Sequence, residues 1–403
     1  MACALGSVAQ NYGFAGENGH LEGSSSIITQ AHELSSGAAY YNLARRRFGL
    51  LDKGILGPQC FFLAGVYLMY TMRPMQAWSK IQQASQSFHV YLLCNNRLRS
   101  ANENEVAHLK RRQLEQRIYW SCYKAECEHR AELELPAGPL ATSGYPDMHP
   151  SAPDFITRDA GSAENSPEFI ESPSSAASRR IQGSLAYLEA SWYYYLTEIT
   201  LRRMENEVLR LFYRNRHIDW VDHNIPSMVS ATSHIEEQLD TWYACINKFV
   251  CMLILTLRRS YDRLPPSLHR SGTEELLRMI QGRIFECKIW LYRPFLYYAI
   301  HSPVYSPNWN LALPFVDKAL STCFRAVAEG TSQHRHHGTF FAIRCPVAQS
   351  LCLIAASRSE AVRERLQPDW REQIEAFIQR SRYWEAECPG VTESIELLRG
   401  QLR

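Results

Sequence analysis

The chain has 403 residues, of which 46% are hydrophobic, and it carries 43 Lys and Arg against 41 Asp and Glu. A chain of this length and composition can bury a substantial core, as one large domain or two smaller ones. Its formal net charge of +2 is too balanced to attract a phosphate backbone over the whole surface, which disfavours nucleic-acid binding by bulk charge.

The cysteines, the first residues and the apolar runs indicate in which cellular compartment the protein is expected. The 12 cysteines are scattered through apolar stretches such as WSCYKAEC and WYACINKFVC and form no CxxC pair. This usage is typical of reduced thiols in a cytosolic or nuclear protein and offers no ligand set for structural zinc. The first residues, MACALGSVAQNYG, do not resemble a signal peptide. The longest apolar runs are shorter than the roughly 20 residues of a membrane span, so we expect no membrane contact.

The first part of the chain divides into a leader and a helical half. Residues 1–37 are rich in Gly, Ser, Asn and Ala without an amphipathic period, which predicts a disordered leader. Residues 38–140 show the apolar spacing of helices, with prolines where the segments PQCFF and PMQAW begin. Within this half, RRQLEQRIYWSCYKAECEHRAEL predicts an amphipathic helix that ends before Pro136.

A second helical half follows an interruption. Residues 141–183 combine prolines with serines and acidic residues, which predicts a disordered insertion because too little apolar surface is available to offset the chain entropy. Helical spacing returns over residues 184–403, beginning with a helix capped by Ser184. No run of alternating strand residues is evident. The predicted fold class is all-α, a multi-helix domain of packed antiparallel helices interrupted by the insertion.

No pattern of a catalytic or metal site is present. The chain has no phosphate loop, no GxSxG elbow and no HExxH sequence. The segment HRHHG, with His334, His336 and His337, lacks regularly spaced carboxylate or thiolate partners, so we interpret it as a solvated loop. Carboxylates alternate with arginines at helical spacing, as in REQIEAFIQR, which predicts surface ion pairs rather than an acid/base pair. We therefore expect no catalytic residue, no metal site, no cofactor and no enzyme activity.

The segment IWLYRPFLYYAIHSP is unusual. Pro294 inside an apolar helical stretch removes a backbone donor and predicts a kink. Arg293 lies beside Trp290 and Phe295, where a guanidinium is costly to bury without a partner. Two interpretations follow: Arg293 is a paired structural residue, or it contacts a ligand at the kink.

The order of these segments is similar to that of a known family. On one predicted helix the basic pair Arg111 and Arg112 precedes Tyr119 and Trp120, and LPAGPL leads from this helix into the insertion. This arrangement resembles the middle homology region of fungal zinc-cluster transcription factors. In that family a helix with a basic pair ahead of an aromatic-Trp pair also leads into an acidic or Ser/Pro-rich insertion.

Further segments extend the resemblance to residues 39–360. Arg293, Pro294 and Phe295 are similar to the late arginine-proline-aromatic element of the family. The segments YYNLARRRFGLL, PQCFFLAGVYLMYTMRPMQAW and VDKALSTC also look like family segments, in the expected order. The resemblance implies a nuclear regulator of RNA polymerase II transcription. Its implied partners are the transcription machinery or a full-length family member, together with a small-molecule effector.

One family feature is missing from this sequence. Family members normally carry an amino-terminal six-cysteine cluster that binds two zinc ions and reads DNA. Nothing of that form precedes Tyr40, and Cys3 is the only cysteine before Cys60. The expectation is a truncated or standalone regulatory domain without direct DNA binding, with zinc only in the missing module.

An alternative from a different class is a helical scaffold or co-regulator that binds partner proteins and never contacts DNA. Helix pairs joined by short loops suit such a scaffold, but the chain shows no fixed repeat period, which counts against a regular array.

Overall fold

The computed structural model describes residues 1–9, 23–51, 54–97, 105–136, 138–140, 149–152, 176–214, 216–261, 266–330 and 335–403. Within these ranges the chain forms α-helices and short 3-10 turns and no strand, which confirms the predicted all-α fold class. Most of the insertion predicted over residues 141–183 lies outside the described residues.

The chain begins with helices rather than with a disordered leader. Helices α1 (Ala2–Val8) and α2 (Gly23–Arg45) pack on each other, and α1 also packs on α3 (Leu56–Tyr70). Ala4 and Val8 are buried in this contact. The prediction for residues 1–37 is therefore wrong over Ala2–Val8 and from Gly23 onward.

Small side chains explain why the sequence did not predict helices α1 and α2. A Cβ atom at Gly37 would lie 2.7 Å from Cγ1 of Val8, so the glycine allows α1 and α2 to approach closely. Helices joined through glycine and alanine bury little apolar area per residue and show no strong amphipathic pattern. Composition alone thus gave a false indication of disorder.

The first predicted half also holds α4 (Pro74–Arg97) and α5 (Glu105–Leu133). α4 packs on α3 and on α5, and α5 packs on α8 (Ala176–Phe212). The α5 helix ends before Pro136, as predicted. α8 begins at Ala176 rather than at Ser184, so the boundary predicted at residue 183 is wrong. The last proline of the insertion precedes Ala176, and AASRRIQ contains only residues that a helix tolerates.

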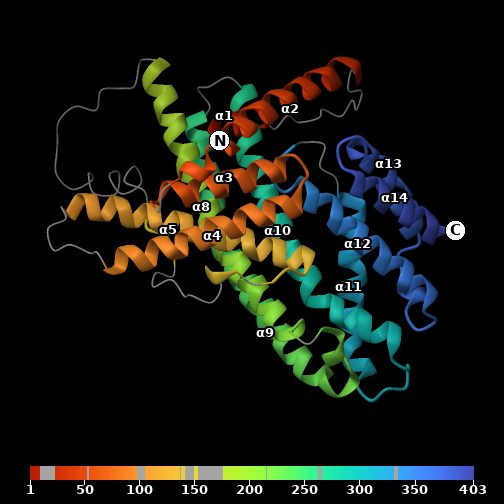
Figure 1. The fold of residues 1–403 in the computed structure, drawn as a ribbon. Helices are drawn as coiled ribbons and strands as arrows, with labels where there is room; N and C mark the ends of the chain where they lie inside the picture. The colour runs from red at the N-terminus through yellow and green to blue at the C-terminus, as the bar shows by residue number, and fades with distance from the viewer. Residues whose placement is uncertain are drawn as a thin grey trace.

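The remaining helices build the largest core. They are α9 (Ile225–Tyr261), α10 (Pro266–His301), α11 (Trp309–Glu329), α12 (Thr339–Arg358), α13 (Trp370–Ser381) and α14 (Pro389–Leu402). α10 packs on α8, α9, α11 and α12, and α12 packs on α11, α13 and α14. In Figure 1, α13 and α14 lie on the opposite side of the molecule from α4 and α5. α10 therefore connects α8 to the carboxyl-terminal helices.

Helix α10 continues through Pro294. Proline has no N–H, so the carbonyl of Trp290, four residues earlier, loses its helical hydrogen bond. The hydroxyl of Tyr213 donates to that carbonyl at 2.7 Å, which satisfies it from outside the helix. The expected site of distortion is thus accommodated within one described helix.

One described helix, Thr339–Arg358, is long and apolar enough by length and composition to cross a membrane. Half of the most apolar stretch of this helix is buried inside the protein. Ile343, Leu353 and Ile354 of this helix belong to the carboxyl-terminal core.

Candidate functional site

The basic and aromatic residues of α5 lie on different sides of that helix. Arg111 is partly exposed, with its Nε atom 3.6 Å from Oε1 of Glu115, and Arg112 is exposed. Trp120 is only 5% exposed and meets the rings of Tyr119 and Tyr123 edge-on, with centroids 5.0 and 5.4 Å away. Trp120 therefore helps to form the core that α4, α5 and α8 share.

The late Arg-Pro-Phe element also has two faces. Phe295 is fully buried and stacks on Phe315 of α11, with ring centroids 4.8 Å apart. Pro294 is buried beside it. Arg293 points to the opposite side and lines a cavity. The structure thus separates the packing residue of this element from the charged one.

The interior of the helix bundle contains a cluster of charged side chains, called here the ionic cluster. It joins α5, α8 and α10 and consists of Lys124, Glu128, Glu198, Arg202, Glu205, Arg283 and Glu286. Charges at this depth are costly unless they are paired and hydrogen-bonded. The prediction that carboxylates pair with arginines only on helix surfaces is therefore wrong for these residues.

Two arginines connect the three helices. Arg202 bonds Glu128 of α5 at 3.0 Å and also pairs with Glu205 on its own helix. Arg283 of α10 bonds Glu198 of α8 at 2.9 Å and also pairs with Glu128. Glu128 thus accepts from both guanidinium groups. Removing either arginine would take away one of the two cations that Glu128 pairs with.

The titration of the carboxyls brings the charges close to balance. Burial alone would raise the pKa of Glu128, but Arg283 and Arg202 outweigh it and hold that pKa at about 2. Burial raises the pKa of Glu205 to about 7, against the opposing charge of Arg202. With Glu205 protonated, the three cations of the ionic cluster face three carboxylates. Glu205 is therefore the group whose ionisation unbalances the cluster near neutral pH.

Stability is expected to depend on pH through Glu205. Its folded pKa, about 7, lies above its unfolded value of about 4.3, so protonated Glu205 stabilises the fold below the unfolded pKa. This contribution is lost as the pH rises through the folded pKa. Urea unfolding from about pH 5 to about pH 8 should lower the free energy of unfolding of the wild type, relative to Glu205→Gln, by about 3 kcal/mol. Parallel pH curves for the two proteins would contradict this assignment.

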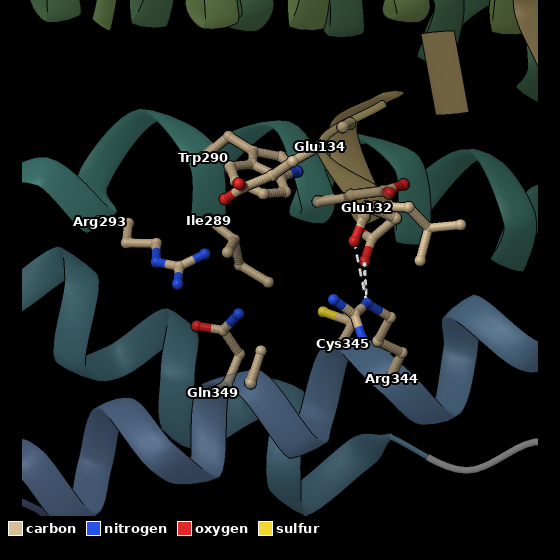
Figure 2. A pocket seen from close by; sticks show the side chains of 12 residues that line it. Glu132, Glu134, Ile289, Trp290, Arg293, Arg344, Cys345 and Gln349 are labelled. Carbon is tan, nitrogen blue, oxygen red and sulfur yellow. Dashed lines mark hydrogen bonds and ion pairs between the residues drawn. The ribbon is translucent and has the colours of Figure 1, made fainter. Parts of the chain in front are cut away.

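A cavity of about 280 Å³ lies next to the ionic cluster. The end of α5, one face of α10 and one face of α12 line it, and Glu286 borders both the cavity and the cluster. Figure 2 shows Arg293 and Gln349 at one end of the cavity, with Glu132 and Arg344 at the other. Nε of Arg344 donates to the backbone carbonyl of Glu132 at 2.9 Å. The cavity thus has two polar ends.

Arg293 is a cation of this cavity that forms no ion pair with a described carboxylate, although the charge of Glu132 contributes to raising its pKa. Its guanidinium lies over the ring of Trp290, 5.5 Å from the centroid. Among the residues that the structure describes, no carboxylate forms an ion pair with Arg293 and no group accepts its hydrogen bonds. Both interpretations of Arg293 therefore stay open: Trp290 supplies a structural contact within the chain, and the guanidinium also reaches the cavity, where a ligand could contact it.

The acidic side chains of the cavity already have cationic neighbours or lie at its rim. Burial, together with Glu286 and Glu205, raises the pKa of Glu132 well above its ordinary value, and Arg344 lies 3.9 Å from this carboxyl. Glu286 is held by Arg283 of the ionic cluster. At the Arg293 end of the cavity, the guanidinium is therefore the charged group with which a ligand can pair.

The histidine-rich segment is part of the packed interior. Arg335, between His334 and His336, is buried against the ring of Trp384 and bonds Glu387 and the carbonyl of Tyr70. The prediction of a solvated loop is therefore wrong from Arg335 onward, while His334 lies outside the described residues. In the described part of the chain, no three His, Cys, Asp or Glu side chains form a group that suits a metal ion.

The sequence signal for the ionic cluster was present but ambiguous. Lys124 and Glu128 are four residues apart, and Glu198, Arg202 and Glu205 follow the same helical spacing on α8. The same spacing is found in exposed pairs such as Arg210 with Glu207. Only the packing of the three helices determines which of these spaced charged residues are buried.

Comparison of the chain with protein-family models, with curated proteins and with solved structures found no match.

Proposed function

We propose that this chain is a regulatory domain of the fungal zinc-cluster type of transcription regulator, and that it acts in the nucleus on RNA polymerase II transcription. The observation that carries the proposal is the position of the family-like segments in the fold. The helix of Arg111 and Trp120 ends at the Arg293 cavity, and Arg293 of the late element lines that cavity. Segments far apart in the sequence thus meet at one ligand-sized space.

In this proposal DNA recognition belongs to a separate six-cysteine module, and this chain restrains an activation function through contacts with protein partners. The ionic cluster makes such a domain responsive, because three helices share one set of charges and any shift of α10 changes pairing on α5 and α8.

The proposal predicts that the chain changes transcription when it is brought to a promoter. A heterologous DNA-binding module carrying an activation segment is fused to residues 1–403, and reporter output is compared with that of the same fusion lacking the chain. Restraint of about fivefold or more is expected, the lower end of ordinary coupling between sites. Arg210→Met, an exposed change on α8, should keep the restraint, whereas Arg202→Met should lose it.

Two outcomes would contradict the proposal. Equal reporter output with and without the chain in a fungal nucleus would remove the regulatory role. Tight, salt-dependent DNA binding by the purified chain alone would place DNA recognition within it, against the assignment made here. If the chain binds partner proteins in the cytoplasm and has no effect on reporter output at a promoter, the helical scaffold is favoured instead.

A further inference from the structure

Arg293 identifies the chemistry of a ligand. Its guanidinium lies in the cavity without a carboxylate or carbonyl partner in the described part of the chain. A guanidinium in a confined site without a hydrogen-bonded partner is costly, and an anion that enters the cavity would supply that partner. Because the guanidinium is a planar fork of donors, it matches a carboxylate or another planar oxyanion with two parallel hydrogen bonds.

Gln349 supplies a second polar group at the same end of the cavity. The side chain is only 3% exposed, and its carboxamide oxygen accepts from the Cys323 thiol at 3.1 Å. Its carboxamide nitrogen faces the thiol of Cys345, which also lines the cavity. Sulfur is a weak acceptor, so a ligand oxygen would be a better partner for this donor. Figure 2 shows Gln349 and Arg293 on the same side of the cavity.

Most of the cavity wall is polar, but its apolar part favours an organic ligand. Trp290 and Ile289 of α10 present apolar surface between the two polar ends (Figure 2), and Ala348 of α12 also lines the cavity. A bare inorganic ion would leave this surface in contact with water, whereas a hydrocarbon body would cover it. The volume of about 280 Å³ lies just below the usual range for ligand sites, about 300–1,000 Å³, so the ligand is small.

We propose that the Arg293 cavity binds a small organic carboxylate. The carboxylate group lies on the guanidinium of Arg293 within reach of Gln349, and the hydrocarbon body lies against Trp290 and Ile289. The opposite end, at Glu132 and Arg344, accommodates a second polar group of the same ligand. As the effector of a transcription regulator, this ligand rests on the function proposed above, but its binding to the chain does not.

Calorimetric titration of the purified 403-residue chain tests the proposal. The probes are butyrate, hexanoate and succinate, with butyramide as the uncharged match and inorganic phosphate as the anion without a hydrocarbon body. At least one carboxylate should bind saturably, and butyramide should bind about tenfold or more weakly than butyrate, because it cannot form the charged bonds. Absence of saturable binding for all three carboxylates, or binding of phosphate alone, would overturn the proposal.

Variants assign the binding to the cavity. Arg293→Gln should weaken carboxylate binding by about tenfold to a hundredfold, the usual cost of lost hydrogen bonds to a charged group. Arg293→Lys, which keeps the charge without the fork, should be intermediate, and the exposed control Arg210→Gln should bind as the wild type does. Equal affinity of Arg293→Gln and the wild type would overturn the assignment.

A second variant keeps the test decisive if Arg293→Gln fails to fold. Ala348→Leu fills the cavity from α12 without touching a charge, and carboxylate binding should be lost while the helical circular dichroism is retained. Wild-type affinity in the folded Ala348→Leu protein would place the carboxylate elsewhere. If a carboxylate binds saturably but the chain does not change reporter output, the binding site is supported and only the regulatory role is contradicted.

Discussion

Replacing Arg202 by methionine is expected to lower the free energy of unfolding by about 3–5 kcal/mol, the usual cost of removing one partner from a buried ion pair. Arg202 is only 2% exposed and is bonded to Glu128 and Glu205. Methionine fills similar space but leaves Glu128 with Arg283 as its one remaining cation. Because whole domains are stable by about 5–15 kcal/mol, the loss is a large part of the total.

Urea unfolding at neutral pH measures this loss, with two comparisons built into the design. Arg210→Met removes an exposed pair with Glu207 on the same helix and should not move the unfolding midpoint. Adding Glu128→Gln to Arg202→Met removes a carboxylate that has lost one of its two cations, so the double variant should recover part of the loss. If Arg202→Met unfolds at the wild-type urea concentration, the ionic cluster does not hold the three helices together.

Replacing Phe295 by alanine is also expected to lower the free energy of unfolding by about 3–5 kcal/mol. The ring is fully buried, stacks on Phe315 and belongs to the largest core of the protein. Alanine leaves a void where α10 meets α11, and the surrounding helices relax only partly into it. Thermal unfolding of the variant should give a lower melting temperature with the helical signal retained at low temperature.

A control on the same part of the chain separates burial from aromatic character. Tyr305, just after α10, is 89% exposed, so Tyr305→Ala should melt as the wild type does. A melting temperature for Phe295→Ala equal to that of Tyr305→Ala would contradict the core role of Phe295. Arg293, two residues earlier, has no such core role, so its variants are expected to act on ligand binding rather than on packing.

The helices themselves could be predicted from the sequence because apolar spacing records which face of a helix is buried. The α5 helix and its end before Pro136, and the helix that carries Leu291 and Phe295 on its buried side, follow from that spacing. The leader was predicted wrongly because Ala4, Val8 and Gly37 pack through close approach, which leaves no strong periodic pattern.

The candidate site could be predicted only in part. Arg293 was recognisable because a charge stood inside an apolar segment next to a proline. Glu132 and Gln349 gave no such signal, since each lies among polar neighbours and becomes part of the cavity only when α5 and α12 meet α10. Likewise, the hydroxyl of Tyr213 bonds the carbonyl of Trp290, which Pro294 leaves without its helical donor, across 77 residues of sequence separation that no local pattern records.

The regulatory role is tested most directly by the reporter output of the promoter-tethered chain, with wild type, Arg202→Met and Arg210→Met measured side by side. The expected result is restraint of about fivefold or more by the wild type and by Arg210→Met, with output restored by Arg202→Met because the three helices no longer pack. The same output from all three fusions and from the fusion without the chain would contradict a role in transcription.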